Sequence, residues 1–304
     1  MTNPILSWLN LRYYKAGGKN KAKIKIQKPQ VYQDSFSASL EAIRQIEKLC
    51  KPPYTLMVSG GIDSQAMLWA WIKSGIDFTP VHFRYIDRNG TVFNDHDSET
   101  LKLIESMHGI NIEYRDYYPL DFLRHNLTAY ATEYQCTSPQ LTMHMHMIDS
   151  FKEGTVILSG NPILQTFPFN YTQLGLARFS EYKTNISVIP FFFLFSHDLA
   201  FSFQPTINRF RRELKINDAA SLSAYIYKYY TYMYSGFSVI PQISKLTGFE
   251  KIKEYFDDKD YLITAKDRLR FARKPSKRIY DIKFRYLMET LVEPFDEDVD
   301  VEYT

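Results

Sequence analysis

The feature that most constrains the fold of this chain is one short polar and glycine-containing segment, Ser59-Gly60-Gly61-Ile62-Asp63-Ser64. An apolar run at residues 54–58 precedes it and predicts a strand. A run at 65–73 that is rich in Ala, Met, Leu and Trp follows and predicts a helix. Adjacent glycines let the backbone approach a ligand closely, and a helix N-terminus favours negative charge. The order of strand, glycine turn and helix therefore predicts an anion-binding site.

We call this segment the 59–64 loop. Its polar side chains indicate what kind of anion it would bind. Ser59 and Ser64 supply hydroxyl donors, whereas the carboxylate of Asp63 would repel a phosphate. The carboxylate suits such a site if a divalent cation lies between Asp63 and the phosphates, because Mg²⁺ prefers hard oxygen ligands. The alternative is a Ser- and Gly-rich turn in which Asp63 and Ser64 only cap the following helix.

The complete loop resembles the PP-loop of the ATP pyrophosphatases, whose pattern is SGGxDS, and it matches every fixed position. That superfamily includes NAD synthetase, GMP synthetase, the synthetase half of asparagine synthetase and enzymes that modify tRNA. The resemblance, which covers roughly residues 35–165, implies ATP and Mg²⁺ as cofactors, with the phosphates on all six loop residues and the metal on Asp63. It also implies an α/β fold of the HUP-like, PP-loop type, in which helices cover both faces of a parallel sheet. No Gly-Lys-Ser/Thr follows, so this is not a Walker A loop.

Strands and helices alternate on both sides of the loop, which is typical of parallel βαβ units and predicts the α/β class. Further strands are expected at 78–86, 111–117 and 155–159, and helices at 34–49, 95–107 and, in two pieces broken near Ser138-Pro139, 120–150. Ligands of open α/β sheets bind at the carboxyl ends of the strands. Gly160 and Asn161 follow the last of these strands, so we expect them near the loop as further cofactor-binding residues. A simple turn is an equal alternative for this pair.

Three regions are expected along the chain. Residues 1–33 form an N-terminal extension whose alternating Lys and Ile at 23–26 predict a short edge strand. Residues 34–170 form the nucleotide-binding α/β domain. Residues 171–304 form a mainly helical region, with helices at 206–214, 219–234 and 280–291, a basic segment and an acidic tail at 296–302 that frays in solvent. The apolar run at 188–195 is far shorter than the roughly 20 residues of a membrane span and predicts buried packing.

The basic segment, residues 266–285, carries nine Lys and Arg residues. Such density suits a clamp for pyrophosphate, a track for a nucleic-acid backbone or a solvated charged face. Enzymes of the resembled superfamily bring a distant basic residue to the leaving group. By that resemblance we expect Lys274 and Lys277 to act in catalysis beside Asp63, and Arg278 to bind the cofactor.

The overall composition predicts an ordinary globular protein, with 45% hydrophobic and 23% charged residues. A net charge of +3 is too small to indicate nucleic-acid binding by itself. Cys50 and Cys136 do not form a disulfide framework, and no signal peptide is evident, so we expect a cytoplasmic protein without membrane attachment. No CxxC pair is present, which argues against sulfur transfer. On a helix, His144 and His146 would lie on different faces and would not share a metal, whereas on a strand they would share a face.

The resemblance implies an ATP pyrophosphatase that adenylates an acceptor carboxylate or carbonyl, releases pyrophosphate and then transfers nitrogen, as an amide ligase does. The acceptor would be a small molecule or a nucleobase. No glutaminase domain is evident, so ammonia would be free or come from a separate donor protein. One alternative is a PP-loop enzyme that modifies nucleic-acid bases. Another is a nucleotide-binding or assembly protein without turnover, and homo-oligomers are compatible with each.

Overall fold

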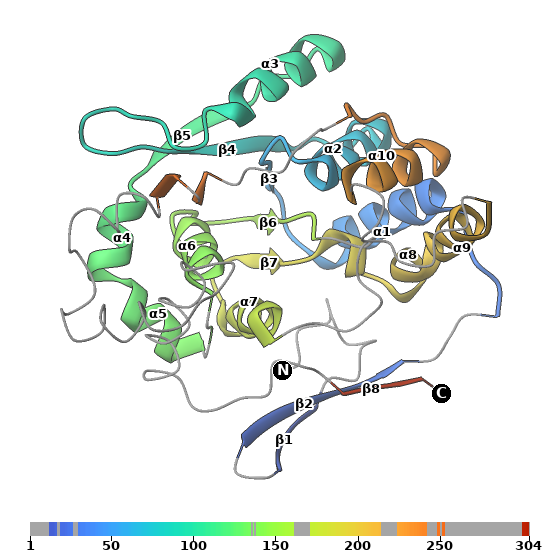
Figure 1. The fold of residues 1–304 in the computed structure, drawn as a ribbon, viewed down its shortest axis with the longest axis horizontal. Helices are drawn as coiled ribbons and strands as arrows, with labels where there is room; N and C mark the ends of the chain where they lie inside the picture. The colour runs from blue at the N-terminus through green and yellow to red at the C-terminus, as the bar shows by residue number, and fades with distance from the viewer. Residues whose placement is uncertain are drawn as a thin grey trace.

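The computed structural model describes residues 12–16, 19–26, 30–134, 136, 138–160, 171–213, 224–241, 248–249, 251–252 and 300–303. Its centre is a five-stranded, all-parallel sheet of order β5-β4-β3-β6-β7, shown in Figure 1. The strands are β3 (Tyr54–Met57), β4 (Thr79–Tyr85), β5 (Glu113–Tyr117), β6 (Thr155–Ile157) and β7 (Ser187–Ile189). The predicted α/β class is thereby confirmed, and four of the strands coincide with predicted ones.

The helices follow the apolar spacing of the sequence and end at residues suited to capping. Asp34 accepts a hydrogen bond from the Ser37 backbone N–H at 2.9 Å, while Gly75 and Gly109 end two helices in the left-handed conformation. The described helices are α1 (Ser35–Leu49), α2 (Ile62–Ser74), α3 (His96–His108), α4 (Pro119–His125), α5 (Leu127–Tyr134), α6 (Pro139–Ile148), α7 (Tyr171–Tyr182), the 3-10 turn η2 (Phe192–Leu194), α8 (His197–Ser202), α9 (Gln204–Glu213) and α10 (Ala224–Tyr234).

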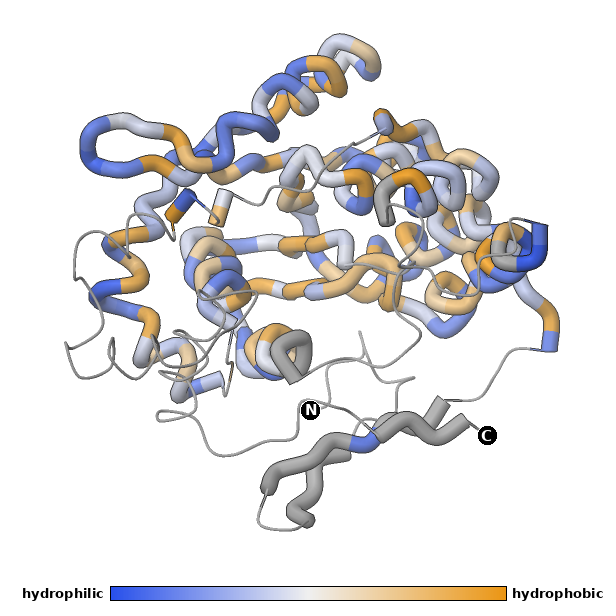
Figure 2. The backbone as a smooth tube through the Cα atoms, in the orientation of Figure 1, coloured by the Kyte–Doolittle hydropathy of each residue, from blue (hydrophilic) through white to orange (hydrophobic). Residues whose placement is uncertain are grey.

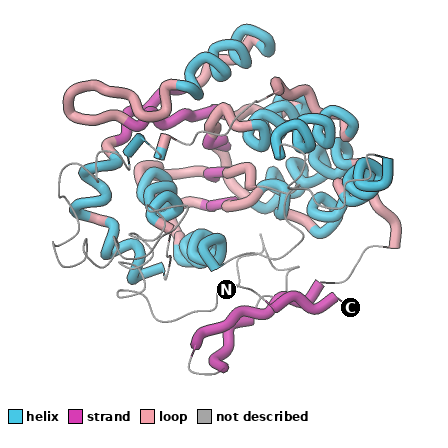
Figure 3. The backbone as a smooth tube through the Cα atoms, in the orientation of Figure 1, coloured by secondary structure: helices cyan, strands magenta, loops and turns pink. Residues whose placement is uncertain are grey.

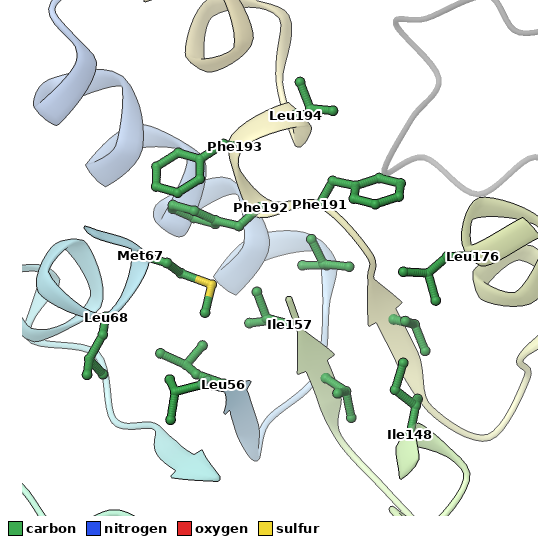
Figure 4. Close-up of a cluster of buried hydrophobic side chains, with 14 of the residues drawn as sticks. Leu56, Met67, Leu68, Ile148, Ile157, Leu176, Phe191, Phe192, Phe193 and Leu194 are labelled. Carbon is green, nitrogen blue, oxygen red and sulfur yellow. The ribbon is translucent and has the colours of Figure 1, made fainter. Parts of the chain in front are cut away.

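Helices cover both faces of the sheet, as Figure 3 shows. Helices α2 and α3 carry the chain toward the β5 edge, whereas α6 and α7 carry it toward the β7 edge. Because parallel crossovers are right-handed, these two sets lie on opposite faces. In Figure 4, Met67 and Leu68 of α2 lie across the strands from Ile148 and Leu176. All four side chains are buried, so one continuous core fills both sides of the sheet.

The apolar run after residue 187 is buried, as predicted, but its first residues also form the fifth strand. β7 pairs with β6 in parallel, and Phe191, Phe192 and Phe193 then pack over the sheet (Figure 4). Figure 2 shows how hydrophobic β6, β7 and the following turn are. The sheet therefore continues beyond residue 170. Three residues give too short a pattern to distinguish a strand from the aromatic run beside it.

A second sheet joins the two ends of the described chain. It has the order β1-β2-β8, with β1 at Arg12–Ala16, β2 at Lys19–Ile26 and β8 at Asp300–Tyr303. β2 pairs antiparallel with β1 and parallel with β8. The predicted edge strand is therefore a central strand, and the predicted fraying tail is in part a strand. Alternation of Lys and Ile indicates one apolar face, but it does not reveal how many neighbours a strand has.

The segment at 120–150 forms three helices where two were predicted. The expected break before Pro139 is present, and Asn126 separates α4 from α5. Predicted helices at 206–214 and 219–234 correspond to α9 and α10, whereas the one at 280–291 lies outside the described residues. Within the described ranges, no helix combines the length and the apolar character needed to cross a membrane.

Candidate functional site

The 59–64 loop lies where a parallel sheet of this order leaves a crevice. It joins the carboxyl end of β3 to α2, and β3 is the strand from which the chain proceeds first toward β4 and later, on the other side, to β6. Neighbouring connections leave in opposite directions at such a switch point, and ligands of open α/β sheets bind there. The loop is therefore at the position where this architecture binds ligands.

The backbone of the loop needs its glycines. Gly60 has φ +68°, and a Cβ placed there would lie 3.3 Å from the Asp97 carbonyl oxygen. Ser64 closes the loop from within, because its hydroxyl donates to the Gly61 carbonyl at 2.7 Å and accepts from the Ser59 backbone N–H at 3.3 Å. Gly61 is the N-cap of α2 and makes no side-chain capping bond. The conformation thus depends on glycine at position 60 and on the Ser64 hydroxyl.

The buried side chain of Gln65 ties the loop to a distant part of the chain. Its amide nitrogen donates to the Gly60 carbonyl at 2.8 Å, and its amide oxygen accepts from the Ile240 backbone N–H at 2.7 Å. A shallow pocket lies beside this bridge, between α2, α3 and residues 238–240. Gln65 therefore links Gly60 of the loop to Ile240, which lies 175 positions away from Gln65 in the sequence.

Asp63 does not cap α2; its carboxylate is bound by two side chains of α10. Lys228 Nζ lies 2.6 Å from Asp63 Oδ2, and the Tyr232 hydroxyl donates to Oδ1 at 2.8 Å. Lys228 is only 2% exposed. Burial first, and the charge of Asp63 second, raise the pKa of Tyr232 well above its usual value, so the hydroxyl stays protonated and donates. The ammonium of Lys228 balances the negative charge of the loop.

An aromatic cluster holds α10 in this position. The Tyr232 ring lies 5.7 Å from Phe193, 5.7 Å from Phe203 and 5.5 Å from Phe237, centroid to centroid. Lys228 and Tyr232 are four residues apart and so share one face of the helix. Sequence reasoning placed a helix here but missed Lys228. Nothing in a run of tyrosines indicates that its one lysine is buried against a loop far away in the sequence.

Behind the loop, a buried histidine fixes the residue that precedes Ser59. His82 Nδ1 lies 2.8 Å from the Val58 carbonyl oxygen, and its Nε2 lies 3.3 Å from the side-chain nitrogen of Asn94. Asn94 in turn donates to the Phe83 carbonyl at 2.9 Å and accepts from the Tyr85 backbone N–H at 2.7 Å. A neutral imidazole with its proton on Nδ1 satisfies both contacts, whereas a second proton on Nε2 would face a donor. Burial lowers the pKa of His82, in agreement with this tautomer.

This arrangement predicts that acid destabilises the fold. Because the pKa of His82 is lower in the folded chain than the ordinary 6.5, the unfolded chain binds more protons below that pH. Stability is therefore full above about pH 6.5 and falls on acidification, by at most about 1.4 kcal/mol per pH unit for one group. Melting temperatures at pH 7.5 and 5.5 measure the effect, and His82→Gln should flatten the dependence. Equal slopes in the two proteins would assign it to other groups, such as His146, whose pKa is also lowered by burial.

The polar residues at the start of α3 lie next to the loop. Asp95 caps the helix by accepting from the His96 backbone N–H at 3.1 Å, and it also pairs with Lys251 at 2.6 Å. Asp97 is buried, with a carboxylate oxygen 3.3 Å from where a Gly60 Cβ would be and 3.6 Å from His96 Nε2. The structure thus brings Asp97 to the glycines of the loop.

The remaining predicted site residues are less informative. Gly160 follows β6 with φ +74°, and a Cβ there would meet the Phe191 side chain at 3.2 Å, so this turn packs on Phe191. Asn161 lies outside the described residues, as do Lys274, Lys277, Arg278 and the rest of the basic segment.

In the described part of the chain, no group of three or more Asp, Glu, His or Cys side chains could hold a metal ion. Burial raises the pKa of Cys136 to about 12, which keeps it a thiol.

Comparison of the chain with protein-family models and with curated proteins found no match in either. The motif and the geometry around it are therefore the basis for inferring what the protein does. For a polyphosphate, the fit is good: the loop has glycine at its tightest point and the N-terminus of a 13-residue helix behind it. For Mg²⁺ on Asp63 the fit is poor, because both carboxylate oxygens already accept hydrogen bonds from α10.

Proposed function

We propose that this protein is an ATP pyrophosphatase of the PP-loop type with a HUP-like sheet. It would bind ATP at the 59–64 loop and adenylate an acceptor carboxylate or carbonyl oxygen, after which a nitrogen nucleophile would attack the activated carbon and displace AMP. One observation carries the proposal: a loop that matches every fixed position of SGGxDS joins β3 to α2 at the switch point of a parallel sheet.

In the proposed reaction the residues of the loop bind and orient the phosphates. Glycine at positions 60 and 61 lets main-chain atoms come close, and the N-terminus of α2 favours the negative charge. The acceptor oxygen forms a bond to the α-phosphorus while the bond to the β-phosphate oxygen breaks, and the electron pair leaves with pyrophosphate. Catalysis would come from positioning and from stabilising that charge. Lys228 assists because it offsets the charge of Asp63.

Magnesium enters this proposal together with ATP. Mg²⁺ commonly keeps several waters and binds through substrate phosphates. The magnesium contact at Asp63 that the resemblance implies is not part of the proposal, because both carboxylate oxygens already accept hydrogen bonds from α10. The catalytic roles of Lys274 and Lys277, the phosphate role of Arg278, a separate ammonia donor, a cytoplasmic location and homo-oligomers stay predictions.

The test is ATP binding compared between two glycine variants at opposite ends of α2. Gly60→Ala and Gly75→Ala both place a Cβ at positive φ, +68° and +72°, but only at position 60 does the Cβ crowd the loop. ATP at 100 times its Kd should stabilise the wild type and Gly75→Ala by about 2.7 kcal/mol. Gly60→Ala should need at least roughly tenfold more ATP, because the loop must shift to relieve the contact with Asp97.

Pyrophosphate release, measured with panels of carboxylates, nucleobases and tRNA in the presence of ammonia, then tests turnover. Release that depends on one acceptor would identify the substrate class, and a tRNA or nucleobase acceptor would favour the base-modifying alternative. The proposal fails if ATP neither stabilises the protein nor yields pyrophosphate with any acceptor.

A nucleotide-binding protein without turnover is the second candidate. The observation that favours it is the engagement of Asp63 by Lys228 and Tyr232, which leaves neither carboxylate oxygen without a partner. ATP-dependent stabilisation together with no pyrophosphate release would support this candidate against the enzyme.

A further inference from the structure

The Asp63 carboxylate already binds a cation, which is the ammonium group of Lys228. One carboxylate oxygen accepts from Lys228 Nζ at 2.6 Å and the other from the Tyr232 hydroxyl at 2.8 Å. Both donors lie on one face of α10, so docking of a single helix brings both to the carboxylate. An ammonium this close leaves little room for a divalent cation and repels it.

The surroundings of Lys228 keep its ammonium group paired with the Asp63 carboxylate. Its side chain is 2% exposed, and Tyr227, Thr231 and Tyr232 beside it on α10 are buried as well. An ammonium that left Asp63 would have to reach solvent past these side chains or stay buried without a carboxylate, which is strongly unfavourable. The Asp63 side chain is itself only 14% exposed, so water would screen the pair weakly.

We propose that Lys228 is the resident counter-ion of Asp63, so that the loop offers no carboxylate to a divalent cation. Resting on the proposed function, the inference adds that any magnesium at this site is held by the nucleotide phosphates and water alone. It departs from the metal-binding role that the resemblance implies for Asp63. Lys228 is accordingly a positioning residue, which keeps the loop electrically neutral and fixes the direction of the carboxylate.

The test uses Mn²⁺ alone, without nucleotide, and counts free Mn²⁺ by electron paramagnetic resonance. Three forms of the full chain are titrated: the wild type, Lys228→Met, and the double variant Asp63→Asn with Lys228→Met, which has a neutral pair of similar size. The wild type should bind Mn²⁺ no more tightly than the double variant. Lys228→Met, which leaves the carboxylate without its ammonium, should gain a site at least tenfold tighter than either.

Binding to other acidic surfaces is the same in all three proteins, so only the differences are interpreted. If Lys228→Met does not fold, the comparison of the wild type with the double variant still decides. Mn²⁺ binding by the wild type at least tenfold tighter than by the double variant would overturn the proposal. If ATP binds to none of the proteins, the proposed function fails. The Mn²⁺ titration still decides whether Lys228 keeps divalent cations from Asp63, because it is done without nucleotide.

Discussion

Replacing Lys228 by methionine should lower the free energy of unfolding by about 3 kcal/mol, the loss typical when one partner of a buried ion pair is removed. Methionine keeps most of the length and the apolar contacts of lysine, so the change isolates the charge. What remains is the Asp63 carboxylate, largely buried, with the Tyr232 hydroxyl as its one described partner. Urea denaturation followed by circular dichroism measures the loss.

Two further variants make that measurement specific. Adding Asp63→Asn to Lys228→Met should restore most of the stability, because a neutral pair needs no counter-charge. Lys102→Met, on the exposed side of α3, should change stability by no more than about 0.5 kcal/mol. Equal losses in the single and double variants would mean that packing of the lysine chain, and not its charge, stabilises α10 against the loop.

We expect Gly154→Ala to destabilise the sheet strongly. Gly154 precedes β6 with φ +82°, and a Cβ there would lie 2.2 Å from the Pro53 carbonyl oxygen, a backbone atom. That oxygen already accepts from the Thr155 N–H at 2.9 Å, so it cannot retreat without breaking the pairing of β3 with β6. Backbone strain and overpacking together should cost about 3–4 kcal/mol.

Gly75→Ala is the matched control for Gly154→Ala. Its φ is +72°, and nothing lies within 4 Å of the added Cβ, so only the strain of about 1 kcal/mol remains. The difference between the two melting curves measures the contact with Pro53. Similar losses in both variants would show that β6 shifts to accept the methyl group.

Local patterns predicted the α/β class and the position of the loop because both depend on residues that are close together in the sequence. The apolar run before Ser59 corresponds to β3, and the helix-forming run after Ser64 corresponds to α2. Parallel pairing follows from the alternation of strands and helices, since such strands need a crossover.

What could not be predicted depends on residues far apart in the sequence. Lys228 meets Asp63 across 165 positions, and only the packing of α10 on α2 decides that encounter. The pairing of β2 with β8 spans most of the chain, and the three residues of β7 are too few to show a period. The resemblance predicts that basic residues of the dense segment at 266–285 approach the loop, and that segment lies outside the described residues. Among the residues that the structure describes, it is Lys228, buried beside tyrosines of α10, that meets the loop.

The separation of Asp63 from its partner also affects how the site assembles as the chain is made. Synthesis proceeds from the N-terminus, so the loop and the first strands leave the ribosome long before α10 does. Until that helix arrives, the Asp63 carboxylate lacks these two partners, and the glycine bend has no support from Lys228 and Tyr232. In a ribosome-bound nascent chain from which α10 has not yet emerged, the loop should therefore lack these two contacts, and the emergence of α10 would complete the site that we propose for nucleotide.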